Sequence, residues 1–178
     1  MATPIFINPL TPMNGEVLDT LREGIEEAFD SAVAVSTQAD NLVDYAFNAK
    51  RKQYLAPLIL STLRDLKAEP GAHYLGIVDV DLYSPGFNYV FGETDIGSRV
   101  ALVSLYRLKP ERYGLPPNET VFSTRMLKEA VHELGHTYYL NHCQSPRCVM
   151  HSSQNLNRTD LKRASFCPAC QHQLEEAL

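Results

Sequence analysis

The sequence lacks long apolar runs, an excess of basic residues and, over most of its length, cysteine. No stretch approaches the ~18 consecutive apolar residues that a membrane-spanning helix needs, and the first residues lack the basic start and unbroken apolar core of a signal peptide. Lys and Arg total 16 against 21 Asp and Glu, so the formal charge of -5 offers no broad basic surface to nucleic acid or an anionic membrane. We therefore expect a cytoplasmic protein, a monomer, with neither a nucleic acid nor a membrane as partner.

Internal repeats and low-complexity segments are absent too. Hydrophobic residues make up 44% of the chain and charged residues 21%, which is ordinary globular usage and excludes a disordered, collagen-like or coiled-coil protein. A length of 178 residues suits one domain, or one domain with a small appendage, and allows a sizeable buried core.

Cysteine is missing from the first 142 residues, and all four cysteines fall within the last 36. Four of the six histidines lie nearby, between residues 132 and 151. In a reducing compartment, clustered cysteines are metal ligands more often than disulfide partners, although two structural disulfides are the alternative. The clustering indicates that the function resides near this end of the chain.

Hydrophobic periodicity predicts helices interleaved with strands, an α/β or α+β arrangement in which helices cover a twisted sheet. The expected helices are residues 16–29, with Asn14 as N-cap, residues 54–66 and residues 122–138. The expected strands are residues 31–35, 74–80, 87–91 and 100–105, with loops at 92–97 and 110–117.

Residues 132 to 142 read His-Glu-Leu-Gly-His-Thr-Tyr-Tyr-Leu-Asn-His and contain the H-E-x-x-H pattern. His132 and His136 are about one helical turn apart, so both imidazoles can reach one metal ion. His142 would lie about 15 Å along a continued helix from His132, so the chain must turn back after residue 139 for it to become the third ligand. Three imidazoles leave one coordination position open, which is typical of a catalytic zinc site.

Glu133 follows His132 directly and lies about 100° further round the helix. This keeps its carboxylate near the water of the metal without making it the natural third ligand. Zinc lowers the pKa of a bound water to about 7 and polarises a carbonyl, and Glu133 can take the proton of the water and pass it to a departing amine. The pattern predicts hydrolysis of an amide bond.

The four cysteines form two close pairs, Cys143-x4-Cys148 and Cys167-x2-Cys170. This spacing suits a tetrahedral four-cysteine zinc site with no open position, which would be structural and would hold the last segment against the domain. A thioredoxin-type redox pair at Cys167 and Cys170 is the alternative, but the strand-to-helix context of that chemistry is absent.

Other residues near these motifs have less defined roles. Met150 is expected to form a hydrophobic floor below the histidine zinc, with core filling as the alternative. A peptidase also needs a donor that stabilises the transition state, and Tyr106, Tyr113 and Tyr139 stay open candidates. No ligand role is assigned to the four remaining candidates, His73, His151, Asp79 and Asp81.

Through these residues the sequence resembles the archaemetzincin family of metzincin zinc metallopeptidases. The family motif runs His-Glu-x-x-His-x-x-Gly-x-x-His-Cys, then four residues, Cys, one residue, Met and a distant Cys-x-x-Cys. The segments 79–85, 91–93 and 100–104 also resemble the sheet region of the family. The motif positions matched here are His132, Glu133, His136, His142, Cys143, Cys148, Met150, Cys167 and Cys170.

The resemblance implies a metzincin-like twisted mixed sheet, an antiparallel edge strand that can bind an extended substrate by β-augmentation, an active-site helix, a Met-turn and a small zinc-stapled C-terminal segment. We expect an N-terminal subdomain over residues 1–142, with the sheet and the active-site helix. A C-terminal subdomain over residues 143–178 would hold the Met-turn and the four-cysteine site. The resemblance also implies two zinc ions per chain, one catalytic and one structural.

One position departs from the family in a way that bears on the site. Tyr139 stands where the family has Gly, a residue suited to a left-handed exit from the helix. Asn141 tolerates that conformation and is expected to absorb the turn. The leading hypothesis is a zinc-dependent peptidase acting on peptide or protein substrates. The alternative is a catalytically silent zinc protein that binds peptides, in which Tyr139 narrows the site or displaces His142.

Overall fold

The computed structural model describes residues 3–37 and 41–178. Its helices are α1 (Gly15–Phe29), α2 (Ala56–Asp65), α3 (Glu119–Thr137), α4 (Leu156–Leu161) and α5 (Pro168–Ala177). Its strands are β1 (Ile5–Pro9), β2 (Val33–Val35), β3 (Phe47–Asn48), β4 (Gln53–Leu55), β5 (His73–Val78), β6 (Leu82–Tyr83), β7 (Gly92–Asp95) and β8 (Val100–Ser104). Short 3₁₀ turns are η1 (Asp44–Ala46), η2 (Tyr106–Leu108) and η3 (Pro110–Tyr113). Within the described ranges, no helix combines the length and apolar character that a membrane span requires.

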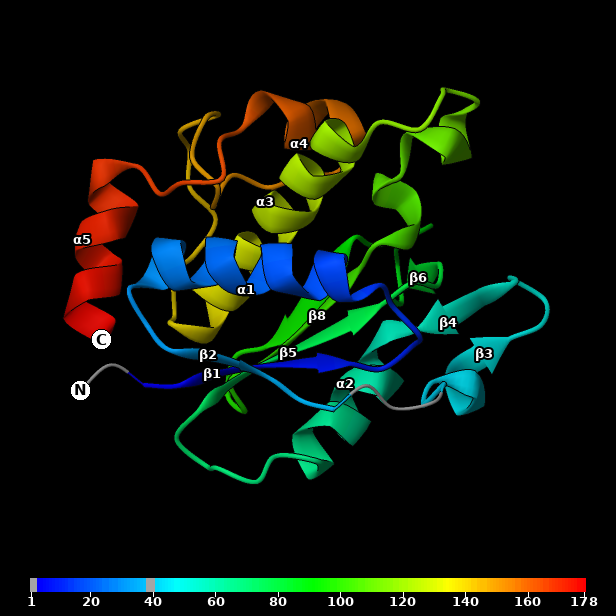
Figure 1. Cartoon of the computed structure of the whole chain (residues 1–178), viewed down its shortest axis with the longest axis horizontal. Coiled ribbons are helices and arrows are strands. Elements are labelled where there is room, and N and C mark those ends of the chain that lie inside the picture. Colours follow the sequence, from blue (N-terminus) through cyan, green and yellow to red (C-terminus); the bar gives the residue numbers. More distant parts are fainter. Residues whose placement is uncertain (1–2, 38–40) are drawn as a thin grey trace.

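The main sheet has five strands in the order β2-β1-β5-β8-β7 (Figure 1). The first four run parallel, whereas β7 runs antiparallel to β8, with Gly92 opposite Val103. A smaller sheet has the order β3-β4-β6. The mixed main sheet and its antiparallel edge strand confirm the expected fold class.

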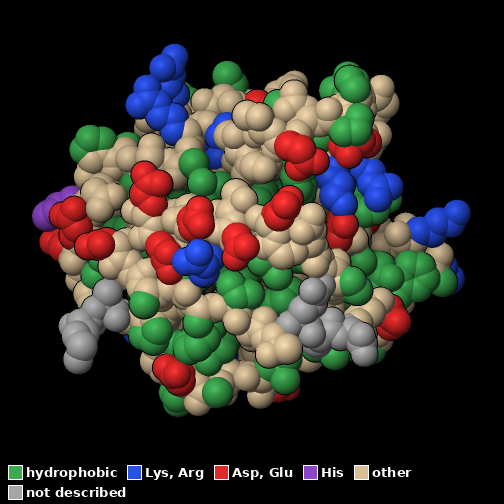
Figure 2. All heavy atoms as spheres, in the orientation of Figure 1, with side chains coloured by type: hydrophobic (Ala, Val, Ile, Leu, Met, Phe, Trp, Pro, Cys, Tyr) green, Lys and Arg blue, Asp and Glu red, His purple; other side chains and the backbone are tan. Residues whose placement is uncertain are grey.

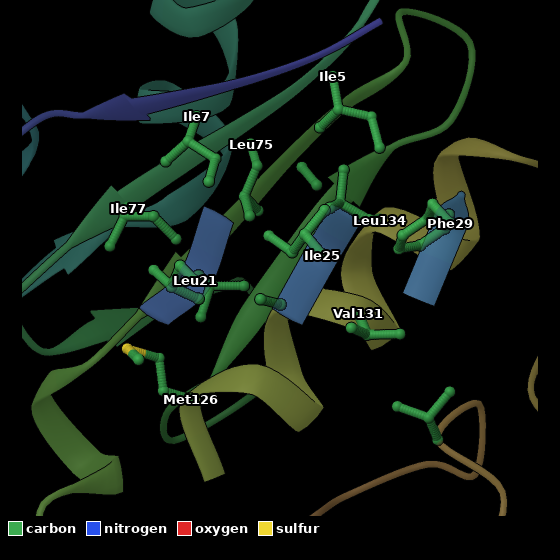
Figure 3. Close-up of a cluster of buried hydrophobic side chains, with 14 of the residues drawn as sticks. Ile5, Ile7, Leu21, Ile25, Phe29, Leu75, Ile77, Met126, Val131 and Leu134 are labelled. Carbon is green, nitrogen blue, oxygen red and sulfur yellow. The ribbon is translucent and has the colours of Figure 1, made fainter. Parts of the chain in front are cut away.

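Helices cover both faces of the main sheet, α1 and α3 on one and α2 on the other (Figure 1). Successive side chains of a strand point to opposite faces, so Leu75 and Ile77 of β5 belong to the core below α1 and α3, and Tyr74 and Val78 to the core against α2. Figure 3 shows the first core, in which sheet residues meet Leu21, Ile25, Met126 and Leu134 from the two helices.

Helix α1 forms where its sequence predicts. The Asn14 side chain accepts a hydrogen bond from the Glu16 amide at 3.0 Å, which satisfies one of the free N–H groups of the first turn. The buried positions of the helix are Leu18, Leu21, Ile25 and Phe29. Its solvent face carries acidic side chains, visible across the middle of Figure 2. Arg22 forms ion pairs with two of them, Glu23 and Glu26. The helix is thus amphipathic, and its acidic face points away from the sheet.

Helix α3 is buried along most of its length, although many of its side chains are polar. Asn118 caps its first turn by accepting a hydrogen bond from the Val121 amide at 3.0 Å. The helix contacts α1, the sheet and α4, so little of its surface faces water. Polar side chains in such a place need partners, because burial without them is costly. The charged and polar residues of α3 therefore mark the part of the fold where chemistry is concentrated.

The predicted helices and most predicted strands are confirmed, but the strand expected over residues 87–91 is wrong. The Phe87 amide donates to the Ser84 carbonyl in a tight turn, and Arg51 donates to the carbonyls of Phe87 and Asn88. These backbone groups are bound by a turn and by the distant Arg51 side chain instead of by a neighbouring strand. A strand forms instead at β7, within the loop expected over 92–97. The segment is polar, but its pairing with β8 outweighs the low strand propensity of its residues. The sequence pattern also does not predict β1, β3, β4, β6, α4 or α5, and Tyr54 and Leu55, expected to begin the second helix, lie in β4.

His73 is a buried histidine at the start of β5, with its side chain satisfied by packing and one hydrogen-bond partner. Its Nδ1 lies 2.7 Å from the Thr137 hydroxyl, and its ring stacks on Tyr138 with centroids 3.7 Å apart. Burial, followed by the charges of Arg99 and Lys67, lowers the pKa of His73 to about 3. The folded protein thus holds this imidazole neutral.

We expect His73 to make the folded protein less stable in mild acid. Below the ordinary pKa of about 6.5 the unfolded chain binds a proton at this position and the folded chain does not, so the free energy of unfolding falls as the pH drops toward 3. Urea unfolding with excess zinc should show that wild type loses about 2 kcal/mol more than His73→Gln between pH 7.5 and 5. Parallel pH curves for the two proteins would contradict this.

Candidate metal centre

Three histidines converge at the C-terminal end of α3. His132 and His136 project from successive turns of the helix, and His142 returns from the segment that follows. One ring nitrogen from each lies within 4.8 Å of the other two, and the ring centroids are 4.7, 4.9 and 5.3 Å apart. His132 is buried, His136 half-buried and His142 exposed, so the cluster opens to solvent on one side.

Backbone carbonyls orient two of these rings. His132 donates from Nδ1 to the Val149 carbonyl at 2.8 Å, and His136 donates from Nδ1 to the Leu140 carbonyl at 2.7 Å. A carbonyl only accepts, so each Nε2 keeps its lone pair for another partner. The two Nε2 atoms lie 3.2 Å apart. Two nitrogens bound to one zinc at about 2.1 Å in a tetrahedral site lie roughly 3.4 Å apart, so this geometry fits zinc.

The surroundings keep all three imidazoles neutral, which is the form that binds a metal. Burial lowers the pKa of His132 well below its usual value, and the positive charge of Lys162 lowers it further. Burial likewise lowers the pKa of His136 and of His142.

The turn that returns His142 to the helix is made by Tyr139 itself. Helix α3 ends at Thr137, and Tyr139 adopts φ 65°, the left-handed conformation that the glycine of the family motif adopts most easily. Asn141 has no positive φ, so the expectation that it absorbs the turn is wrong. Tyr139 is 60% exposed, so its side chain faces solvent. The substitution keeps the turn at the same residue, at the cost of an unfavourable backbone conformation.

The side chain of Glu133 extends from α3 toward the edge strand β7. Its side chain is buried, and its Oε2 lies 2.7 Å from the Thr94 hydroxyl. Burial raises the pKa of the Glu133 carboxyl to about 8, and the hydrogen bond from Thr94 opposes that rise. A carboxyl whose proton affinity is raised in this way is suited to accept and release a proton near neutral pH.

Met150 packs against α3 at Gly135, and its expected role as a hydrophobic floor below the histidine zinc stays a prediction. It is fully buried, and a Cβ added to Gly135 would lie 2.5 Å from its Sδ atom. Gly135, between His132 and His136 in the sequence, therefore gives this side chain room to pack against the helix. The Val149 carbonyl that orients His132 belongs to the same turn.

The four cysteines form a second cluster in the C-terminal segment. All four are free thiols in this structure, and their sulfur atoms lie within 4.8 Å of one another, which favours one shared metal site over the two disulfides considered as an alternative. The Sγ atoms of Cys143 and Cys167 are 3.7 Å apart. Two sulfurs bound to zinc at about 2.3 Å in a tetrahedron lie roughly 3.8 Å apart, so this cluster also fits zinc.

Backbone amides prepare the cysteine cluster for thiolates. The amides of Ser145 and Cys167 donate to the sulfurs of Cys143 and Cys148 at 3.4 and 3.3 Å. Cys167 caps the N-terminus of α5, and a hydrogen bond from the Cys170 amide lowers the pKa of the Cys167 thiol to about 7. Burial raises the pKa of Cys148 and of Cys170, so these two thiols need a metal to hold them as thiolates.

A buried ion pair joins α3 to the C-terminal segment. Lys162, with no exposed side-chain surface, lies 3.2 Å from Glu129 of α3 and donates to the His151 carbonyl at 3.4 Å. Thr159 donates to the same carboxylate at 3.0 Å. The pair holds the turn around Met150 against the helix. Lys162 and Thr159 lie 30 or more residues from Glu129 in the sequence and belong to no motif. The sequence therefore gives no sign of these contacts.

The structure places the remaining candidates away from metal ligation. His151 bonds through Nδ1 to the Cys143 carbonyl at 2.8 Å, Asp79 pairs with Lys109, and Asp81 pairs with Arg107 at 2.6 Å. The Tyr113 hydroxyl donates to the Arg107 carbonyl, and the Arg112 guanidinium stacks over Tyr106. Among the described residues, no hydrogen bond links Tyr106, Tyr113 or Tyr139 to the three histidines or to Glu133.

Known proteins resemble this chain in both sequence and fold. The model of a family described as peptidase family M54 matches residues 15–176. A protein named archaemetzincin from Pyrococcus horikoshii is 49% identical over 135 residues, which cover 75% of this chain and 72% of that protein. The crystal structure of a zinc-dependent peptidase from Methanocorpusculum labreanum superposes with a TM-score of 0.88 at 27% identity, covering 96% of this chain and 99% of that one. The archaemetzincin of Archaeoglobus fulgidus, solved with malonate, gives a TM-score of 0.83 at 33% identity, with 96% and 99% covered.

We expect substitutions at Tyr139 to report its left-handed conformation. Tyr139→Gly should leave the free energy of unfolding unchanged or raise it by up to about 1 kcal/mol, because glycine adopts positive φ without a clash but gains freedom when unfolded. Tyr139→Val should lower it by about 1–2 kcal/mol, because a β-branched residue is strained there. Urea unfolding of the zinc-loaded proteins measures both. Equal stability of the two variants would show that residue 139 is not left-handed in solution.

Proposed function

Because the chain belongs to peptidase family M54, the archaemetzincins, and is a zinc metallopeptidase, we propose that His132, His136 and His142 hold its catalytic zinc and that Glu133 is its general base. The observation that carries this proposal is the convergence of three neutral imidazoles within 4.8 Å, beside a buried carboxyl. A bound zinc supplies a Lewis acid for the substrate carbonyl and acidifies the attacking water.

Glu133 then performs the proton transfer. Its carboxylate accepts a proton from the attacking water and delivers it to the nitrogen of the departing amine, so one group acts as base and then as acid. Its burial against β7 holds the carboxylate in a fixed, largely dry position, in which a proton is accepted and released without rearranging solvent. His132 and His136 keep their orientation through the Val149 and Leu140 carbonyls during the reaction.

The peptide substrate is proposed to bind along β7. The Ser104 amide donates to the Phe91 carbonyl at 2.8 Å, so residues 91, 93 and 95 use their backbone groups to pair with β8. The N–H and C=O groups of Gly92 and Thr94 consequently point to the outer edge of the sheet. An extended peptide can pair with them, and this places its scissile bond next to Glu133.

The cysteine cluster is proposed to hold a second, structural zinc. Its four sulfurs leave no open position, and residues 143–178, proposed as a separate C-terminal subdomain, contribute only a few residues to the hydrophobic core. The silent peptide-binding alternative loses its main argument, because Tyr139 points into solvent and His142 joins the other two histidines.

We expect Glu133→Gln to abolish peptide hydrolysis while zinc binding is retained. The amide keeps the shape of the side chain but cannot take a proton, so the rate on a mixed peptide library, followed by mass spectrometry, should fall by about 10²–10⁴-fold. Glu119→Gln, at an exposed position on the same helix, is the matched control and should leave the rate unchanged. Retained turnover, or loss of zinc from the Glu133 variant, would disprove the assigned role.

Metal analysis should find two zinc ions per chain. Cys148→Ser should lower the content to one and reduce thermal stability strongly, because structural zinc contributes folding free energy. His142→Ala should also lower the content to one, with a smaller loss of stability and complete loss of hydrolysis. Native mass spectrometry and thermal unfolding measure these effects. A wild-type chain with a single zinc would exclude one of the two proposed sites.

A further inference from the structure

The carboxylate of Glu133 has one side-chain hydrogen-bond partner among the described residues, and that partner comes from the sheet. The Thr94 Oγ1 atom lies 2.7 Å from Glu133 Oε2 and 3.0 Å from the backbone carbonyl of Glu133. A hydroxyl donates to either oxygen, and both contacts are of good hydrogen-bond length. One oxygen of the carboxylate is therefore engaged by the protein, and the other is left for the reaction.

The same strand also limits where the Glu133 side chain can lie. A Cβ added to Gly92 would be 2.6 Å from Glu133 Cγ and 2.7 Å from the Leu102 carbonyl, so the backbone of β7 passes directly against the glutamate. Gly92 and Thr94 are two residues apart and thus share the face of β7 that meets α3. The glutamate is held at its Cγ by close packing and at its Oε2 by a hydrogen bond.

We propose that Thr94 is a positioning residue for the reaction, which fixes the Glu133 carboxylate in the orientation that proton transfer requires. The proposal rests on the proposed function in one respect, the role of Glu133 as general base. A glutamate has three side-chain torsions, and holding it in advance removes the need to select one conformer in each catalytic cycle. The Thr94 side chain acts through Glu133, with which it forms both of its hydrogen-bond contacts given above.

The position of Thr94 adds a link to substrate binding. Its side chain faces α3, while its backbone N–H and C=O point to the outer edge of β7, where we propose that the peptide pairs. The side chain of Thr94 thus binds the proposed general base, Glu133, and its backbone forms a proposed substrate contact. Changing only the side chain separates the two, because the backbone contact is common to all residues except proline.

The kinetic test compares Thr94→Val with Thr94→Ser. Valine keeps the shape but removes the hydroxyl, so kcat should fall about tenfold or more with KM nearly unchanged. Serine keeps the hydroxyl and should restore kcat to within a few-fold of wild type. Thr124→Val, at an exposed position of α3, is the matched control and should leave kcat unchanged. Wild-type kcat in Thr94→Val would overturn the proposal.

A second measurement does not depend on turnover. Acetohydroxamate binds zinc through its two oxygens and offers a hydrogen bond to a neighbouring carboxylate, so its Kd reports the position of Glu133. Thr94→Val should raise this Kd about tenfold in the wild-type background and leave it unchanged in a Glu133→Ala background. Equal effects in both backgrounds would show a purely structural role and overturn the proposal.

The two measurements also distinguish failure of this inference from failure of the proposed function. A zinc-loaded protein that cleaves no peptide, yet shows the coupled effect on hydroxamate binding, would overturn the proposed activity and support the positioning role. A protein that cleaves peptides with a kcat insensitive to Thr94→Val would overturn the positioning role and support the proposed activity. Zinc content and thermal stability of each variant, expected to match wild type, exclude unfolding as the cause.

Discussion

Two imidazoles one turn apart on a helix can bind one metal ion only at a fixed point beside that helix. A third ligand must therefore be brought to this point by the chain that follows. Helix α3 supplies His132 and His136, but a continued helix would move away from them. The chain reverses at Tyr139, in a conformation that costs an ordinary side chain free energy, and so returns His142. The cysteine cluster begins at the next residue, so the two clusters are adjacent along the chain.

Buried polar interactions hold the segment that follows α3 against the helix. Carbonyls of residues 140 and 149, both after the helix, accept hydrogen bonds from the two helical histidines. The buried Lys162–Glu129 pair fixes the same segment from the other side. An ion pair without solvent around it contributes little net stability, and its loss leaves an unpaired buried charge. Its value here is geometric, because it keeps the turn around Met150 at one distance from α3.

The sheet contributes to the site as much as the helix. β7 places Gly92 and Thr94 against Glu133, and the backbone groups of these two residues point to the outer edge, where we propose that a peptide pairs. This arrangement requires an edge strand, since a strand paired on both sides has no free groups. It also explains why a polar segment, Gly-Glu-Thr-Asp, forms a strand at all. The strand is selected by its pairing with β8 and by its contacts with α3.

Local features of the chain were readable from the sequence, because each depends on residues a few positions apart. Such features include the Asn14 cap, the two cysteine pairs and the spacing of His132, Glu133 and His136. In the structure Asn14 caps α1, and the histidines and the cysteines each form a cluster. The strand expected over 87–91 failed because the backbone there is bound by Arg51, more than thirty residues away. Thr94 and Lys162 carry no motif, and only the packing of β7 and of the C-terminal segment against α3 brings them to the site. The sequence alone determined the candidate metal ligands and their spacing, whereas tertiary structure decided which groups orient them, because orientation depends on contacts between distant segments.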